Sequence, residues 1–230
     1  IDENGILIEN DPNNWDAKDV LPDPADRKIW SIIPNTDYKT DYNNFVDTNA
    51  DDIAGIFRIF NFEVQDYHSV SGSPDETQRC SSDLALGIAD GNDDDLKGVI
   101  NFLRGQDYFD YNGDCNLTDA RLDDQFNKIY LGDFYHSELL VVGPPSANTS
   151  FTNQNQEAYW RSVKGYDVFA EDNKNRKEII YVGGNDGMLH AFNSASGIEE
   201  WGFIPPLLAG TIPTMAVSYT HLTLPTIYSV

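Results

Sequence analysis

Three short apolar runs near the C-terminal end of the chain alternate with clusters of turn-forming residues. The runs cover residues 179–182, 188–193 and 200–204, and glycine, asparagine, aspartate and serine fill residues 183–187 and 194–197 between them. Asn185-Asp186-Gly187 suits a tight hairpin, because these residue types tolerate the positive φ that primed turns require. Two tight hairpins in succession predict a propeller blade or an antiparallel meander.

A different periodicity marks the middle of the chain. Leu96, Val99, Ile100 and Leu103 follow the i, i+3, i+4, i+7 spacing of one helix face, which predicts a helix over residues 93–104 that ends at Gly105. Aspartates at its start complement the helix dipole. The remaining predicted elements are a short helix within residues 51–62, strands at 28–33, 139–142 and 163–169, and a loop at 144–158.

The hairpin region also carries a recognisable signature. Ala191-x-Asn193-x-x-Ser196-Gly197-x-x-x-Trp201 resembles the blade signature of pyrroloquinoline-quinone-type β-propellers. The longer string from Asn185-Asp186-Gly187 to Phe192, followed by 201–206, is similar to the C-terminal propeller domain of the PilY family of type IV pilus assembly and tip-adhesin proteins. The resemblance implies a mainly β fold, namely part of a quinoprotein-like β-propeller with helical and loop insertions.

Further segments carry the same resemblance in the order expected for the family. Residues 101–107 (NFLRGQD) and 131–137 (LGDFYHS) are similar to two of its strings, and Trp15-x-Ala17 and Arg27-x-Ile29 resemble a weaker motif at the start of the domain. The resemblance covers roughly residues 12 to 215. We therefore expect residues 1–216 to be the N-terminal portion of a PilY-type propeller domain. Residues 217–230 look like a translated sequencing adapter, and we expect them to be a non-native tail.

The function implied by the resemblance is non-enzymatic. It comprises type IV pilus assembly, cell adhesion and twitching motility, with a propeller that presents a binding face and is regulated by calcium. The implied partners are pilin, minor pilins and host or abiotic surface ligands, and the implied location is the pilus tip (fimbrium) or outer membrane surface of a Gram-negative bacterium, after export. The alternative is a pyrroloquinoline-quinone-dependent dehydrogenase, which shares the blade signature but would need many blade repeats and a catalytic carboxylate beside calcium.

Charge narrows the range of partners. The 38 acidic and 15 basic residues of the 230-residue chain give a net charge of −23. Nucleic acids and anionic membrane surfaces are polyanions, so the charge argues against both as partners. No run of 18 apolar residues is present, so the sequence predicts no transmembrane segment. Cys80 and Cys115 lack zinc-site spacing, and the sequence leaves open whether they form a disulfide.

One acidic loop has the oxygen ligands that a hard cation prefers. Asp110, Asn112, Asp114 and Asn116 alternate along the chain, and Asp119 follows close behind. Oxygens at loop positions 1, 3 and 5 suit calcium, although position 12 lacks the bidentate glutamate of an EF-hand. We expect a metal site here, and the alternative is an acidic loop rich in Asx turns.

Other polar residues have a structural interpretation. Asp133, His136 and Ser137 lie too close in sequence to converge as a catalytic triad, whose members come from separate elements. Asn185-Asp186-Gly187 is expected to be a hairpin turn, and His190 a packed strand residue with satisfied hydrogen bonds rather than a ligand. The sequence therefore predicts no catalytic residues and no organic cofactor.

Overall fold

The computed structural model of the chain describes residues 15–36, 42–57, 93–107, 116, 118–123, 126–135, 137–152 and 155–211. Its helices are α1 (Ala17–Val20), α2 (Ala50–Phe57), α4 (Asp93–Arg104), α5 (Gln156–Val163) and α6 (Tyr166–Asp172), with 3-10 turns η1 (Asp47–Asn49) and η4 (Pro206–Thr211). Its strands are β1 (Ile29–Trp30), β2 (Leu140–Val142), β3 (Ile179–Gly183), β4 (Leu189–Asn193) and β5 (Glu199–Phe203).

The strands form one five-stranded sheet in the order β1-β5-β4-β3-β2. Strands β2 to β5 pair antiparallel, and the two tight hairpins predicted from the turn residues are confirmed by the β3–β4 and β4–β5 pairings. Strand β1 adds to β5 in parallel, with Ile29 opposite Gly202. A segment near the start of the described chain therefore closes one edge of the sheet, next to the last strand.

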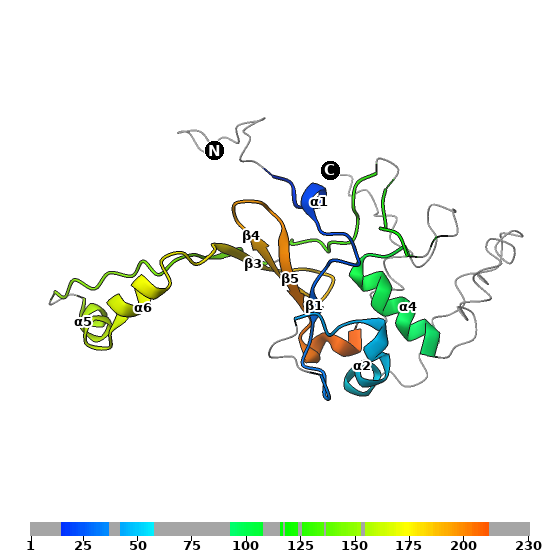
Figure 1. Ribbon diagram of the computed structural model, residues 1–230, viewed down its shortest axis with the longest axis horizontal. Helices are drawn as coiled ribbons and strands as arrows, with labels where there is room; N and C mark the ends of the chain where they lie inside the picture. The colour runs from blue at the N-terminus through cyan, green and yellow to red at the C-terminus, as the bar shows by residue number, and fades with distance from the viewer. Residues whose placement is uncertain are drawn as a thin grey trace, which may run out of the picture.

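The two faces of the sheet differ in burial. Val182, His190 and Phe192 point to the inner face and are almost fully buried, together with Ile29 of β1. Helices α2 and α4 lie toward the β1 end of the sheet, and α5 and α6 lie far beyond its opposite end (Figure 1). The core therefore lies on one side of the sheet. There the inner face packs against the segment that precedes β1 and the segment that follows α4.

The fold class differs from the expectation of a mainly β protein. The chain is mixed α/β with one open five-stranded sheet, and its described residues form no ring of blades. Strands β1 and β2 have two and three residues, whereas α4 alone has 12. The helical insertions expected from the resemblance thus account for more of the described chain than the strands do.

Local predictions mostly agree with the structure. Helix α4 has the predicted bounds, and α2 occupies the first part of the predicted 51–62 helix, whose remaining residues lie outside the described part. The predicted strand at 163–169 is wrong, since α5 ends and α6 begins there. The side chain of Asn155 accepts a hydrogen bond from the Ala158 amide and caps α5, which starts a helix inside the predicted loop.

Trp15 packs beneath the turn between β4 and β5. Its indole Nε1 donates to the Ser194 carbonyl at 2.9 Å, and Gly197 of that turn has a φ of +71°. A β-carbon at Gly197 would lie 2.3 Å from the Trp15 ring. The turn therefore needs glycine for two reasons, its backbone conformation and the closeness of the indole.

The substitution Gly197→Ala should lower the free energy of unfolding by about 2–4 kcal/mol, because conformational strain adds to a steric clash. Gly165→Ala is the matched control, since Gly165 has a φ of +75° and open space where the β-carbon would lie. It should cost only about 1 kcal/mol. Urea unfolding followed by circular dichroism measures both, and equal losses would show that the Trp15 contact contributes nothing.

Candidate functional site

Four sequence motifs converge on a buried charge network at the inner face of the sheet. We define this network as Arg27, Arg104, Asp186, His190 and Glu199. Arg27 precedes β1, Arg104 is the last residue of α4, Asp186 lies in the β3–β4 turn, His190 is on β4 and Glu199 begins β5. All five are buried. Charged side chains of this kind are almost never buried without partners, so their pairing determines what the site does.

Arg27 and Glu199 form the centre of the network. The Arg27 Nε donates to Glu199 Oε2 at 2.6 Å and its Nη2 donates to Oε1 at 2.8 Å, a bidentate geometry. Its third nitrogen, Nη1, donates to the carbonyls of Leu103 and Arg104 at 3.2 and 3.0 Å. Those carbonyls belong to the last turn of α4, where unpaired acceptors and the negative end of the dipole favour a cation. Arg27 thus joins β5 to the C-terminus of α4.

His190 lies between two carboxylates. Its Nδ1 is 2.7 Å from Glu199 Oε1, and its Nε2 is 3.0 Å from Asp186 Oδ2. Asp186 also accepts hydrogen bonds from the amides of Gly132, at 3.0 Å, and Met188, at 3.1 Å. Two acceptors on opposite sides of the imidazole are best satisfied when both ring nitrogens carry protons.

The pKa shifts within the network follow from these contacts. Burial alone lowers the pKa of His190, but Asp186 and Glu199 outweigh burial and raise it to about 9. Burial raises the pKa of Glu199 and of Asp186, but charge and hydrogen bonds together outweigh burial and hold both pKa values below their usual range. For Glu199 these come from Arg27 and His190, and for Asp186 from His190 and the amides of Gly132 and Met188. At neutral pH the centre therefore holds two cations and two anions.

Arg104 ties the network to the N-terminal loops. Its Nη1 donates to Asn43 Oδ1 at 2.9 Å and to the Phe45 carbonyl at 3.1 Å. Its Nη2 donates to the carbonyls of Pro24 and Arg27 at 3.2 and 2.6 Å. Burial, followed by repulsion from Arg27, lowers its pKa to about 10, so the guanidinium remains charged at neutral pH. One side chain thus holds two N-terminal segments in place, residues 24–27 and 43–45.

The network has no room for a substrate. The cavity beside Asp186, lined also by Tyr130 and Gly132, has a volume of about 10 Å³, enough for one water molecule at most. The His190 and Glu199 side chains have no solvent exposure. An imidazole between carboxylates can relay protons in an open active site, but the His190 ring is closed off from solvent. The arrangement can hold the sheet against α4, and it offers no surface to a ligand.

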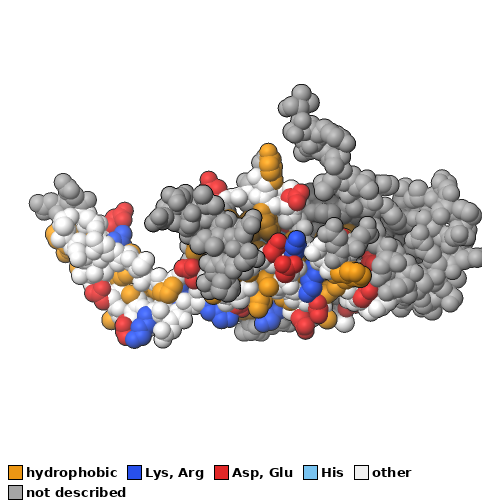
Figure 2. Space-filling view, turned by 90° about the horizontal axis from the view of Figure 1, so that it is seen from above, with side chains coloured by type: hydrophobic (Ala, Val, Ile, Leu, Met, Phe, Trp, Pro, Cys, Tyr) orange, Lys and Arg blue, Asp and Glu red, His pale blue; other side chains and the backbone are white. Residues whose placement is uncertain are grey.

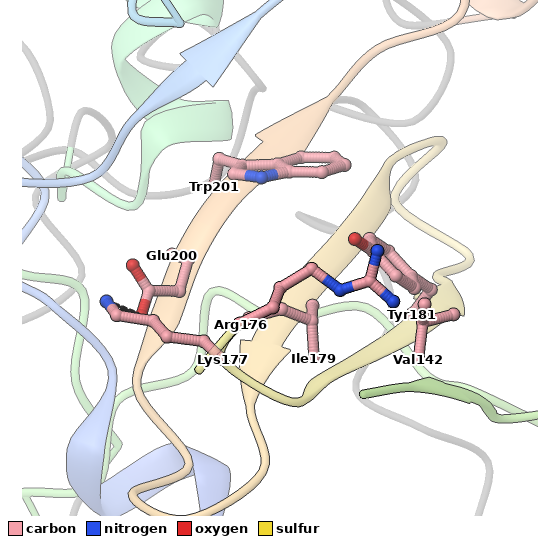
Figure 3. A pocket seen from close by; sticks show the side chains of 7 residues that line it. All are labelled: Val142, Arg176, Lys177, Ile179, Tyr181, Glu200 and Trp201. Atoms are coloured by element: carbon pink, nitrogen blue, oxygen red, sulfur yellow. Dashed lines mark hydrogen bonds and ion pairs between the residues drawn. The ribbon is translucent and has the colours of Figure 1, made fainter. Parts of the chain in front are cut away.

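A groove with different chemistry lies on the opposite face of the sheet. It has a volume of about 330 Å³ and is shown in Figure 3; its lining residues are Val142, Arg176, Lys177, Ile179, Tyr181, Glu200 and Trp201. The rings of Tyr181 and Trp201 lie 5.8 Å apart, and Lys177 pairs with Glu200 at 2.7 Å. This groove is open to solvent, and aromatic rings form much of its wall.

The blade-signature residues occupy turns and strands of the two hairpins. Asn185, Asp186 and Gly187 form the β3–β4 turn, Ala191 is fully buried on β4, and Ser196 and Gly197 lie in the β4–β5 turn. The Asn193 Oδ1 accepts from the Ala195 amide at 3.0 Å, which braces that turn. Trp201 packs edge-on against Trp30 of β1, with ring centroids 6.1 Å apart.

The predicted metal site falls largely outside the described residues. Asp110, Asn112 and Asp114 lie outside them, as do Cys80, Cys115 and His136. Asn116 is described, and its Oδ1 accepts from the Thr118 amide and hydroxyl at 3.3 and 2.8 Å, an Asx turn. Asp119 lies beside it, partly exposed. Within the described part of the chain, no three His, Cys, Asp or Glu residues are grouped to hold a metal ion.

The sequence did not predict the charge network itself. His190 was expected to be a packed, satisfied strand residue, and the structure confirms it. Asp186 was expected only as a turn residue, yet its side chain is buried and paired. The available signal was that Arg27, Arg104, Asp186 and His190 all belong to strings that carry the family resemblance. Residues that recur in motifs far apart in sequence are candidates for contact with one another.

Comparison with known proteins identifies relatives for part of the chain. Over up to half of its length, the chain is homologous to type IV pilus biogenesis factors. One relative is the type IV pilus biogenesis factor PilY1 of Pseudomonas aeruginosa strain UCBPP-PA14, 35% identical over 116 residues, which are 50% of this chain and 8% of the relative. Another is the PilY1 homolog of Xylella fastidiosa strain Temecula1, 39% identical over 75 residues, 33% of this chain and 6% of the relative.

These matches cover a small part of large proteins. The chain spans less than a tenth of the length of the curated relatives it matches. No family model matches the chain, and no solved structure matches it significantly. Among the residues that the structure describes, no helix is long and apolar enough to cross a bilayer.

Proposed function

We propose that this chain is a non-enzymatic segment of a type IV pilus biogenesis factor, exported to the surface of a Gram-negative bacterium. The observation that carries the proposal is its homology to the PilY1 factors. Pilin and minor pilins are the proposed partners, and adhesion to host or abiotic surfaces is the proposed further role. The buried network supports a structural task, because its ionisable groups are enclosed by protein and are out of reach of a substrate.

We also propose that the sheet is one blade of a larger β-propeller. The antiparallel β3–β4–β5 meander with two tight turns is the arrangement of a blade. Its outer face carries Trp30, Tyr181, Trp201 and Phe203, all only partly buried. Among the residues that the structure describes, none accepts a hydrogen bond from the buried Nε1 of Trp30, although buried indole N–H groups usually have an acceptor. A neighbouring blade from another part of a longer polypeptide would cover this face.

A chimeric factor tests the pilus role. Residues 15–211 of this chain would replace the homologous segment of PilY1 in Pseudomonas aeruginosa, with a segment deletion as the comparison. We expect the chimera to restore the surface pili and the twitching motility that the deletion lacks. Electron microscopy and the amount of sheared pilin measure the surface pili. A chimera that is stably produced and exported but assembles no pili would contradict the proposal.

Calcium binding at the acidic loop remains part of the proposal. Asp110 and Asp114 supply carboxylates at alternate positions, as a hard cation requires. Calcium bound there would favour one conformer of the loop and could shift the population that engages the pilus.

Calorimetric titration with calcium tests this site. Asp110→Ala and Asp114→Ala should each abolish or weaken by about tenfold a binding event seen in the unaltered chain, because each removes a charged ligand. Asp172→Ala, at an exposed carboxylate on α6, is the control and should bind normally. Unchanged binding in the Asp110 and Asp114 variants would assign the loop a structural role only.

A further inference from the structure

The connection between β2 and β3 forms an arm that extends away from the sheet. We define the arm as residues 143–178, which include α5 and α6. Figure 1 shows these helices at the far left, separated from the rest of the molecule. The arm makes polar contacts with the sheet at its base, where Lys177 pairs with Glu200 and the Ser194 hydroxyl donates to Glu178. The helices of the arm are therefore supported mainly by the arm itself.

The arm has almost no core of its own. Among its described side chains, Ala158 alone is buried. Helices of eight and seven residues are marginal in water without tertiary packing. Figure 2 shows hydrophobic side chains on the surface of the arm. Its exposed large apolar side chains include Phe151 (55%), Tyr159 (46%), Trp160 (60%), Val163 (58%), Val168 (66%) and Phe169 (48%). This composition, rich in Trp, Tyr and Phe, is typical of the centre of protein interfaces.

The charge of the arm differs from that of the remaining chain. The arm contains five acidic and five basic residues, so the whole net charge of −23 belongs to the rest of the chain. Two of the arm's charges pair with each other within α5, where Arg161 contacts Glu157 at 2.9 Å, and Lys174 pairs with Glu171 beyond it. The arm is thus a neutral, apolar surface on a chain that is otherwise strongly acidic.

We propose that the arm is a docking site for a basic amphipathic helix of a partner protein. α5 and α6 pack against each other and expose apolar side chains, so a third helix could bury Tyr159, Trp160 and Val168. The net negative charge of the chain attracts a basic helix over long range, and the neutral arm does not oppose its contact. The inference goes beyond the proposed function and does not rest on it.

Charge also distinguishes this occupant from two others. A second copy of the chain would bring another net charge of −23 close to the first, and like charges repel. An anionic bilayer would meet the same repulsion, and the arm has no net positive charge to offset it. Both remain outcomes of the test.

Calorimetry with synthetic helices tests the proposal on the whole chain. The probe is a peptide of about 18 residues with leucines on one face and lysines on the other. Two comparison peptides have glutamates in place of the lysines, or the same residues in an order that removes the apolar face. We expect one-to-one binding of the lysine peptide, at least about tenfold weaker binding of the glutamate peptide, and none of the reordered one.

Variants locate the binding site. Trp160→Ser on α5 and Val168→Ser on α6 should each lower the affinity for the lysine peptide by about tenfold, because each removes an exposed apolar side chain from the proposed contact. Ile198→Ser, at an apolar side chain in the β4–β5 turn that is 46% exposed, should bind the lysine peptide normally. Circular dichroism checks that the variants remain folded.

Three results would overturn the proposal. One is that the lysine peptide does not bind, and another is that the lysine and glutamate peptides bind equally well. The third is that Ile198→Ser lowers the affinity for the lysine peptide as much as the two arm variants do. Light scattering that shows a dimer lost in both arm variants would assign the arm to a second copy. Sedimentation with anionic phospholipid vesicles, lost in the same variants, would assign it to a membrane.

Discussion

Replacing Glu199 by glutamine should lower the free energy of unfolding by about 3–5 kcal/mol. The substitution keeps the shape of the side chain but removes the negative charge that Arg27 and His190 share. Both partners are fully buried, so the charge of Arg27 would remain in the interior without its carboxylate, and His190 would keep Asp186 as its remaining carboxylate partner in the network. Urea unfolding near pH 6 measures the change, and a lower midpoint with an unchanged slope would show that stability alone is affected.

Glu200→Gln is the matched control, one residue further along β5. Its carboxylate pairs with Lys177 at 2.7 Å, but the Lys177 side chain is 65% exposed, so this ion pair should contribute less than about 1 kcal/mol. The double substitution Arg27→Met with Glu199→Leu should cost less than Glu199→Gln alone, because it removes both members of the pair and leaves Asp186 beside His190. Losses of similar size in the Glu199 and Glu200 variants would contradict a stabilising network.

The elements that the sequence predicted well are those determined by local spacing. Helix α4 follows from apolar residues at helical intervals, and the hairpins follow from Asn185-Asp186-Gly187 and Ser196-Gly197. Such signals lie within one turn of helix or one tight loop, so the surrounding fold changes them little. The arm was mispredicted because its helices are short and expose apolar side chains, which removes the usual difference between an inner and an outer face.

The features that the sequence could not predict depend on contacts between distant residues. Arg27 and Glu199 are 172 positions apart, and the parallel pairing of β1 with β5 joins segments just as distant. No local sequence pattern predicts either contact, because each partner is an ordinary charged or apolar residue among its sequence neighbours. The metal-site residues Asp110, Asn112 and Asp114 remain a prediction, since they lie outside the described residues.

The network also predicts how stability depends on pH. The pKa of His190 is raised from 6.5 to about 9 in the folded chain. Its contribution is therefore fully present below about pH 6.5 and is lost as the pH rises toward 9, because the unfolded chain releases this proton first. The pKa values of Asp186 and Glu199 are lowered from 3.8 and 4.5, so their contributions are present above these values and are lost as the pH falls. Stability should be greatest between about pH 4.5 and 6.5.

The loss of stability on the alkaline side depends, within the network, on His190, because its pKa is the one raised from a value near neutral pH. Between about pH 6.5 and 9 the free energy of unfolding should fall by roughly 1.4 kcal/mol per pH unit, about 3 kcal/mol in total. His190→Gln keeps a side chain that can hydrogen-bond to Asp186 or Glu199 but does not titrate, so its alkaline limb should be nearly flat. Urea unfolding measures the free energy of unfolding of the unaltered chain and of His190→Gln across this pH range. The difference between the two curves removes the contributions of the titrating groups that both chains share. Parallel limbs would show that His190 is not held protonated, and the balanced network of two cations and two anions would then be wrong.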